Sequence, residues 1–226
     1  MNHLSYTALF LLLKQSIYHG TGYIDRLTDW HSKDDRKMLS SYSISLIHTL
    51  ICLALPIYNL YYNNNNFIDN YSYYDIQLHH ISMAYYVVDL FYAIVEKQKE
   101  FIIHHSLTMF IEEYYYYNNM PLLLNLSLLI GETTNPYLIL WTLSKHKKYD
   151  LFGKINGFTT YSYAFVRLLC IPVLTAVSYY KICKNQEVSI LNKAVIGGFS
   201  FIFNCGGIYW ARGLLRGYKK WKKKQT

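Results

Sequence analysis

The chain has 226 residues, of which 52% are hydrophobic and only 16% charged, yet its net charge is +8. A soluble protein that binds nucleic acid carries more charge, interleaved with polar surface, so nucleic acid is not an expected partner. The four cysteines show no C-x-x-C spacing, which argues against a disulfide framework or a zinc site built from cysteine. These features favour an integral membrane protein.

Taken in chain order, the first element is a short apolar stretch at residues 4–13, which is too short to cross a bilayer. We expect it to form an interfacial or signal-anchor helix. Six apolar stretches of about twenty residues follow, each long enough for a transmembrane helix. The expected spans are residues 41–62, 78–95, 101–117, 121–143, 157–180 and 188–214.

The predicted fold is therefore an all-α integral membrane bundle of six transmembrane helices. Residues 1–35 form an amino-terminal interfacial segment and cytosolic linker. Residues 36–214 form the six-span domain, and residues 215–226 form a basic cytosolic tail.

Basic residues divide unevenly between the two sides of these spans. With the segment before the first span in the cytosol, that side receives 17 of the 22 basic residues, whereas the opposite side receives only Lys181 and Lys184. Cytosolic loops carry the excess of Lys and Arg, so we expect both termini in the cytosol and the loop 63–77 in the lumen. That loop contains a glycosylation sequon, Asn70-Tyr71-Ser72.

Two lysines near the carboxyl end, Lys223 and Lys224, stand at the fourth and third positions from the last residue. This placement matches the dilysine address for retrieval to the endoplasmic reticulum, which a receptor reads. A lysine-rich tail attracted to anionic lipid explains the same residues equally well.

Ionisable residues lie inside several of the predicted spans. A charge at the centre of such a helix costs at least ~2.5–3.5 kcal/mol, so it normally faces the bundle interior or a water-filled cavity. At about 1.5 Å per residue, His48, Asp89, His104 and His105 fall into one shallow layer on the cytosolic side. A histidine held by Asp89 would be oriented as a general base, although such residues also simply hydrogen-bond one helix to another.

The third span also carries Thr108 and Glu112, four and eight residues after His104, and Glu113 follows. Residues at this spacing share one face of a helix. Glu112 and Glu113 lie near the far interface, where solvation is inexpensive, so we expect a structural role for them.

Glu132 and Arg167 fall near the middle of the fourth and fifth spans. Pro136 removes the helical donor of the Glu132 carbonyl, and Pro172 does the same for Leu168, next to Arg167. Two kinked helices with opposite charges at the midplane predict a buried pair at an irregular level of the bundle that could line a substrate site.

No metal or cofactor is expected. Di-iron membrane desaturases need about eight histidines in HxxxH and HxxHH clusters, and these clusters do not occur around His79, His80 or His104. Neighbouring histidines on one helix also diverge too far to hold a metal without further ligands.

The run "ISMAYYVVDLFYAIVEKQKEFIIHHSLTMF" at residues 81–110 resembles the centre of the TLC domain, with Tyr85, Asp89, His104 and His105 at the matching places. "LIGETTNPYLILW" at residues 129–141 is similar to the next helix of that family and carries Glu132. "RKMLSSYSISLIHTL" at residues 36–50 looks like its first helix and carries His48.

The resemblance implies a multi-pass protein, expected in the endoplasmic reticulum, that binds acyl lipids and influences membrane lipid composition. Ceramide synthases have a His-Asp-x-x-Asp element where this chain has Leu129 to Thr133, so the chain looks more like the other members of the family.

The alternative is an acyltransferase that uses acyl-CoA as co-substrate. The resemblance implies His104, His105 and Asp89 as its catalytic residues, and the candidate substrate-binding residues are His48, Tyr85, Thr108, Glu132 and Arg167. Membrane lipids are the expected partners, and self-association is compatible with the sequence.

Overall fold

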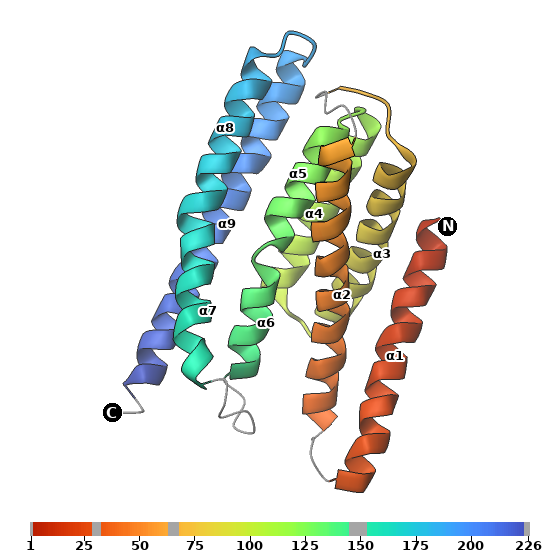
Figure 1. Ribbon diagram of the computed structural model, residues 1–226, viewed down its shortest axis with the longest axis vertical. Helices are drawn as coiled ribbons and strands as arrows, with labels where there is room; N and C mark the ends of the chain where they lie inside the picture. The colour runs from red at the N-terminus through yellow and green to blue at the C-terminus, as the bar shows by residue number, and fades with distance from the viewer. Residues whose placement is uncertain (1, 29–32, 63–67, 145–152, 224–226) are drawn as a thin grey trace. The chain divides into compact units, whose positions relative to one another are not determined.

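The structure is a computed structural model that describes residues 2–28, 33–62, 68–144 and 153–223 (Figure 1). Every regular element in these ranges is a helix, which confirms the all-α expectation. The chain divides into two compact units, residues 1–129 and 130–226, and each is described by itself.

Unit 1 contains α1 (His3–Thr28), α2 (Lys33–Tyr62), α3 (Tyr73–Val95), α4 (Lys99–Tyr117) and the first part of α5 (Pro121–Glu132). α3 packs against α1, α2 and α4. It therefore occupies the middle of the unit, and its first turn begins with a capping box in which Ser72 and Asp75 satisfy each other's backbone N–H groups.

α1 differs from the expected short interfacial helix. It has 26 residues and follows α3 along its length. Tyr6 donates a hydrogen bond to Gln77 at 2.8 Å, Phe10 packs edge-on against Tyr85, and the Lys14 ammonium lies 3.4 Å from the centre of the Tyr92 ring. Polar residues interrupt the apolar run after position 13. The helix nevertheless continues to Thr28, because α1 packs one of its faces against α2 and α3.

A buried polar cluster holds the end of unit 1 where α3 begins. Oδ1 of Asp75 accepts hydrogen bonds from the side-chain amides of Asn59 at 2.8 Å and Asn125 at 2.7 Å. Nearby, Tyr71 donates to the carbonyl of Tyr115 at 2.8 Å, and burial raises the pKa of its hydroxyl, so this donor stays protonated. The cluster joins α2, α3 and α5 through charge-assisted hydrogen bonds.

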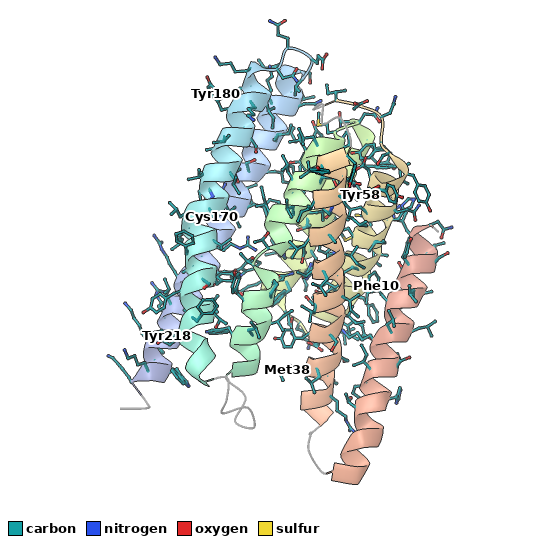
Figure 2. The ribbon with its side chains drawn as sticks, in the orientation of Figure 1. Phe10, Met38, Tyr58, Cys170, Tyr180 and Tyr218 are labelled. Atoms are coloured by element: carbon teal, nitrogen blue, oxygen red, sulfur yellow. The ribbon has the colours of Figure 1, made fainter. Side chains whose placement is uncertain are left out.

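Unit 2 contains α6 (Asn135–Ser144), α7 (Gly153–Phe165), η2 (Val166–Cys170), α8 (Ile171–Lys184) and α9 (Ile190–Lys222). Its core is formed by Tyr163, Ala164, Ala211 and Leu214. Tyr180 near the end of α8 and Tyr218 near the end of α9 lie at opposite ends of the unit (Figure 2). This placement agrees with aromatic belts at two membrane interfaces.

Both predicted helix irregularities occur. The fourth predicted span breaks after Glu132, and α6 starts at Asn135, one residue before Pro136. The fifth continues through a π-helical turn, η2, which contains Arg167 and precedes Pro172. Proline removes an N–H donor, so the backbone widens or breaks one turn earlier.

Four helical segments among the described residues are long and apolar enough to cross a membrane: residues 36–62, 73–95, 157–184 and 190–222. They coincide with four of the six predicted spans. The other two predicted spans correspond to the more polar α4 and to the broken pair α5 and α6.

Candidate functional site

Asp89 of α3 and His105 of α4 form the centre of the candidate site in unit 1. Oδ2 of Asp89 lies 2.7 Å from Nε2 of His105, with side-chain exposures of 29% and 6%. The short α3–α4 turn, with Lys97 in the left-handed backbone region at φ 57°, returns the chain so that the two residues face each other. Nδ1 of His105 is buried and has no hydrogen-bond partner in the described parts of the chain.

His48 and Tyr85 extend this centre toward α2. Their rings stack with centroids 3.8 Å apart. The Tyr85 hydroxyl, which has one proton to donate, lies 3.1 Å from Ser45 Oγ and 3.5 Å from Asp89 Oδ2. His48, Asp89 and His105 therefore occupy a single polar layer formed by three helices, as their equal depth predicted. We call these residues, with Tyr85, the histidine–aspartate layer.

A second group of polar side chains continues from His48. Its Nε2 lies 3.2 Å from Ser82 Oγ and 3.2 Å from Cys52 Sγ. Ser82 in turn donates to Oε1 of Glu112 at 3.4 Å. Glu112 is only 1% exposed, so the expectation of an easily solvated interfacial residue is wrong. Its face of α4 is turned toward α3 and not toward the interface.

His104 and Thr108 are placed differently from the other candidates. His104 is partly exposed, and its ring contacts that of His105. The Thr108 hydroxyl donates to the His104 backbone carbonyl at 2.9 Å within the same helix. Consecutive residues point about 100° apart on a helix, so only His105 of the pair faces Asp89.

Arg167 forms a separate buried site in unit 2. Its Nε donates to Thr134 Oγ1 at 2.9 Å, and its Nη2 donates to the carbonyl of Gly131 at 3.3 Å. That carbonyl lies where the helical chain breaks before Pro136, so the kink supplies an acceptor to the guanidinium. Glu132 is also buried, and its Oε2 accepts a hydrogen bond from Asn135 at 2.5 Å.

Several residues of these sites were missed by sequence reasoning: Ser45, Cys52, Ser82 and Thr134, together with Lys14, which is buried beside Tyr92. Small polar residues are common in transmembrane helices. Ser45 and Ser82 carried one usable signal, because each lies three residues from a predicted site residue on the same helix face.

Four of the residues that carry the family resemblance thus meet within unit 1: His48, Tyr85, Asp89 and His105. A family model of the TLC domain matches residues 39–216. The chain belongs to the TLC-domain family. Searches of curated proteins and of solved structures gave no significant match. The matched TLC region includes every residue of the histidine–aspartate layer and the Arg167 site, whereas α1 lies outside it.

Proposed function

We propose that this TLC-domain protein binds acyl lipids in the membrane and thereby influences membrane lipid composition, with the histidine–aspartate layer receiving the polar part of the lipid. The Asp89–His105 pair is the observation that carries this proposal. Buried ion pairs contribute little net stability compared with apolar packing. A pair with one partly exposed carboxylate is therefore better explained by an interaction with a ligand.

The surroundings suit a molecule with one polar and one apolar part. Val87, Phe91 and Ile103 on α3 and α4 expose large apolar side chains within a few residues of the layer. A lipid whose chains lie along such surfaces can present a hydroxyl, amine or ester to the polar layer at the same time.

The proposal includes six membrane crossings in the endoplasmic reticulum and a cytosolic carboxyl end. The uneven division of basic residues supports this arrangement. α4 has 19 residues, and α5 with α6 has 22, which is close to the length that a bilayer requires.

A specific contact favours a second candidate function, acyl transfer from acyl-CoA to a lipid amine or alcohol. Asp89 orients His105 through Nε2, which leaves Nδ1 as the nitrogen that accepts a proton. In this step the lipid nucleophile attacks the thioester carbonyl and forms the new C–N or C–O bond. The C–S bond breaks, and the proton held by His105 passes to the departing thiolate.

Photocrosslinking tests lipid binding. The purified full-length protein in nanodiscs is incubated with a photoreactive, clickable fatty-acyl phospholipid or sphingoid lipid, and the labelled peptides are identified. We expect labelling on α3 and α4 that falls several-fold in Asp89→Asn and His105→Gln but not in His19→Gln, which alters an exposed histidine on α1. Equal labelling in all four proteins would refute a lipid site at this layer.

An acyl-CoA assay separates the two functions. Wild-type protein, His105→Gln and His104→Gln are incubated with fluorescent acyl-CoA and candidate lipid acceptors, and free CoA thiol is measured. Acyl transfer predicts CoA release that is lost by a factor of about 10²–10⁴ in His105→Gln, the range that a general base contributes. Lipid binding without catalysis predicts crosslinking but no CoA release above background.

A further inference from the structure

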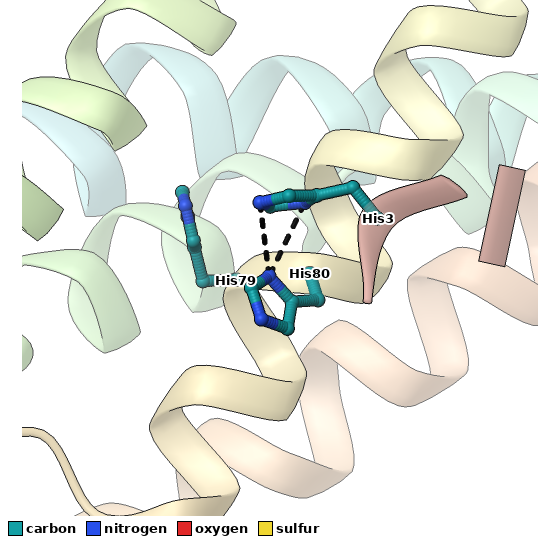
Figure 3. A group of neighbouring side chains, drawn as sticks. All are labelled: His3, His79 and His80. Atoms are coloured by element: carbon teal, nitrogen blue, oxygen red, sulfur yellow. Dashed lines mark hydrogen bonds between the residues drawn. The ribbon is translucent and has the colours of Figure 1, made fainter. Parts of the chain in front are cut away.

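Three histidines outside the histidine–aspartate layer lie together at the opposite end of unit 1. His3 comes from the first turn of α1, and His79 and His80 come from the second turn of α3. Each can offer one ring nitrogen such that the three nitrogens lie within 4.8 Å of one another. Figure 3 shows the three rings as neighbours, with dashed lines joining the ring of His80 to that of His3.

The contact between His3 and His80 is unusual for a hydrogen bond. Nδ1 of His80 lies 3.2 Å from Nδ1 and 3.0 Å from Nε2 of His3 (Figure 3). The two nitrogens of one imidazole point in different directions, so no donor lies along both axes. Two nitrogens bound to one zinc ion at about 2.0–2.1 Å lie roughly 3.3 Å apart in a tetrahedral arrangement. A zinc ion would use one nitrogen of His3, and either observed separation is close to that value.

His79 provides a second, independent observation. Its side chain is fully buried, and neither ring nitrogen has a hydrogen-bond partner in the described residues. A buried polar group left without a partner costs about 1–3 kcal/mol. Oε1 of Glu113 lies 3.8 Å from Nε2 of His79. Coordination of a cation would give a ring nitrogen of His79 a binding partner. It would also place a positive charge beside the Glu113 carboxylate.

The sequence argued against a metal for two reasons: HxxxH clusters are absent, and neighbouring histidines on one helix diverge too far to hold an ion without further ligands. Here the additional ligand comes from another helix, a possibility that helical spacing on a single segment does not address. We propose that His3, His79 and His80 bind a divalent transition-metal cation of the zinc type, with Glu113 supplying negative charge beside it. The ion links the amino-terminal turn of α1 to α3.

The ligand set indicates the class of ion. Imidazole nitrogens suit Zn²⁺, Cu²⁺ and Ni²⁺, whereas Mg²⁺ and Ca²⁺ prefer oxygen ligands. His3 and His80 are partly exposed, and the Glu113 side chain is 34% exposed, so an ion can reach the site from outside the unit. The contact of His79 with the Tyr116 ring, stacked at 4.2 Å, holds one ligand ring in place.

Zinc binding to the full-length protein, purified in detergent without a polyhistidine tag and treated with chelator, tests the proposal. Competition with a chromophoric chelator measures affinity, and elemental analysis measures stoichiometry. We expect about one Zn²⁺ per chain and affinities at least about tenfold weaker in His3→Gln, His79→Gln and His80→Gln. His19→Gln, which alters a histidine of α1 outside the cluster, should bind as the wild type does.

Three further measurements on the wild type keep the result decisive if a variant folds poorly. Co²⁺ added to the wild type should give the visible absorption of a nitrogen-coordinated, four- or five-coordinate ion, and binding should weaken from pH 7.5 to 5.5 as the histidines are protonated. Zn²⁺ should also slow amide exchange in the first turns of α1. A wild type that binds no Zn²⁺, or one that binds it equally well after all three substitutions, would overturn the proposal.

Discussion

Arg167 shows how polar groups of a neighbouring helical segment stabilise a buried charge in this protein. Its guanidinium is buried, and two of its donors reach the backbone carbonyl of Gly131 at the end of α5 and the hydroxyl of Thr134 just before α6. Hydrogen bonds to charged groups contribute about 1.5–3 kcal/mol, more than neutral ones. Thr134 and Gly131 therefore stabilise the buried charge of Arg167 as hydrogen-bond acceptors.

Thr134→Val removes the acceptor of Arg167 Nε while keeping the side-chain shape. We expect it to lower the free energy of unfolding by about 1–3 kcal/mol, because a buried charged donor loses its partner. Thr134→Ser keeps the hydroxyl and loses one buried methyl group, so we expect it to cost about 0.8 kcal/mol, less than Thr134→Val. Thermal unfolding in detergent compares the three proteins, and equal losses for Val and Ser would show that the hydroxyl is not the stabilising group.

The predicted Glu132–Arg167 pair is tested by a double-mutant cycle. Removing one partner of a buried pair costs roughly 3–5 kcal/mol, because the other charge stays uncompensated, whereas replacing both with uncharged residues costs much less. Glu132→Gln and Arg167→Met should each reduce protein yield and melting temperature, and the double variant should recover. Additive losses would mean that the two charges act separately.

At the scale of helices, close packing in unit 2 depends on particular glycines of α9. A Cβ built at Gly197 would lie 2.6 Å from the Tyr179 hydroxyl of α8, and one at Gly207 would lie 3.3 Å from Cδ of Arg167. Their neighbours Gly198 and Gly206 have no such contacts within 4 Å. One glycine of each pair therefore permits the close approach of helices that small residues provide in membranes.

Gly197→Ala and Gly198→Ala form a matched pair. Alanine favours a helix over glycine by roughly 0.5–1 kcal/mol, so Gly198→Ala should leave stability unchanged or slightly raised. Gly197→Ala should be destabilising by about 1–3 kcal/mol, because its methyl group overlaps Tyr179. Melting temperatures in the same detergent measure both, and an equal rise for the two variants would contradict close α8–α9 packing at Gly197.

At the scale of the whole molecule, the side of the membrane on which the amino terminus lies depends on α1. Charge alone predicts a cytosolic terminus. However, α1 runs antiparallel to α2, and His3 contacts the part of α3 near the predicted luminal loop. If α1 crosses the membrane with these contacts, its amino end is luminal.

Cysteine-accessibility labelling tests this topology. Single cysteines are placed at Ser5, at Lys222 and at Asn65, which lies outside the described residues, in a background without native cysteines. We expect Lys222 to react from the cytosol and Asn65 from the lumen, because of the distribution of basic residues. If α1 crosses the membrane beside α3, a cysteine at position 5 should be labelled from the same side as a cysteine at position 65. Labelling of Asn65 and Lys222 from one side would refute the six-crossing arrangement.

The sequence alone determined the helical membrane class, the order of the apolar segments and the two proline irregularities. These properties depend on composition and on the rise along one helix, so they can be read locally. Depth was enough to anticipate that Asp89 and a histidine at position 104 or 105 lie at one level. Only the tertiary structure decided that His105 is the partner of Asp89 and that Glu112 is buried. It also decided that Thr134 accepts a hydrogen bond from Arg167. The contact of His3 with His79 and His80 was likewise decided by the tertiary structure. Those contacts depend on the rotation and neighbours of each helix, which are determined by packing between segments far apart in the chain.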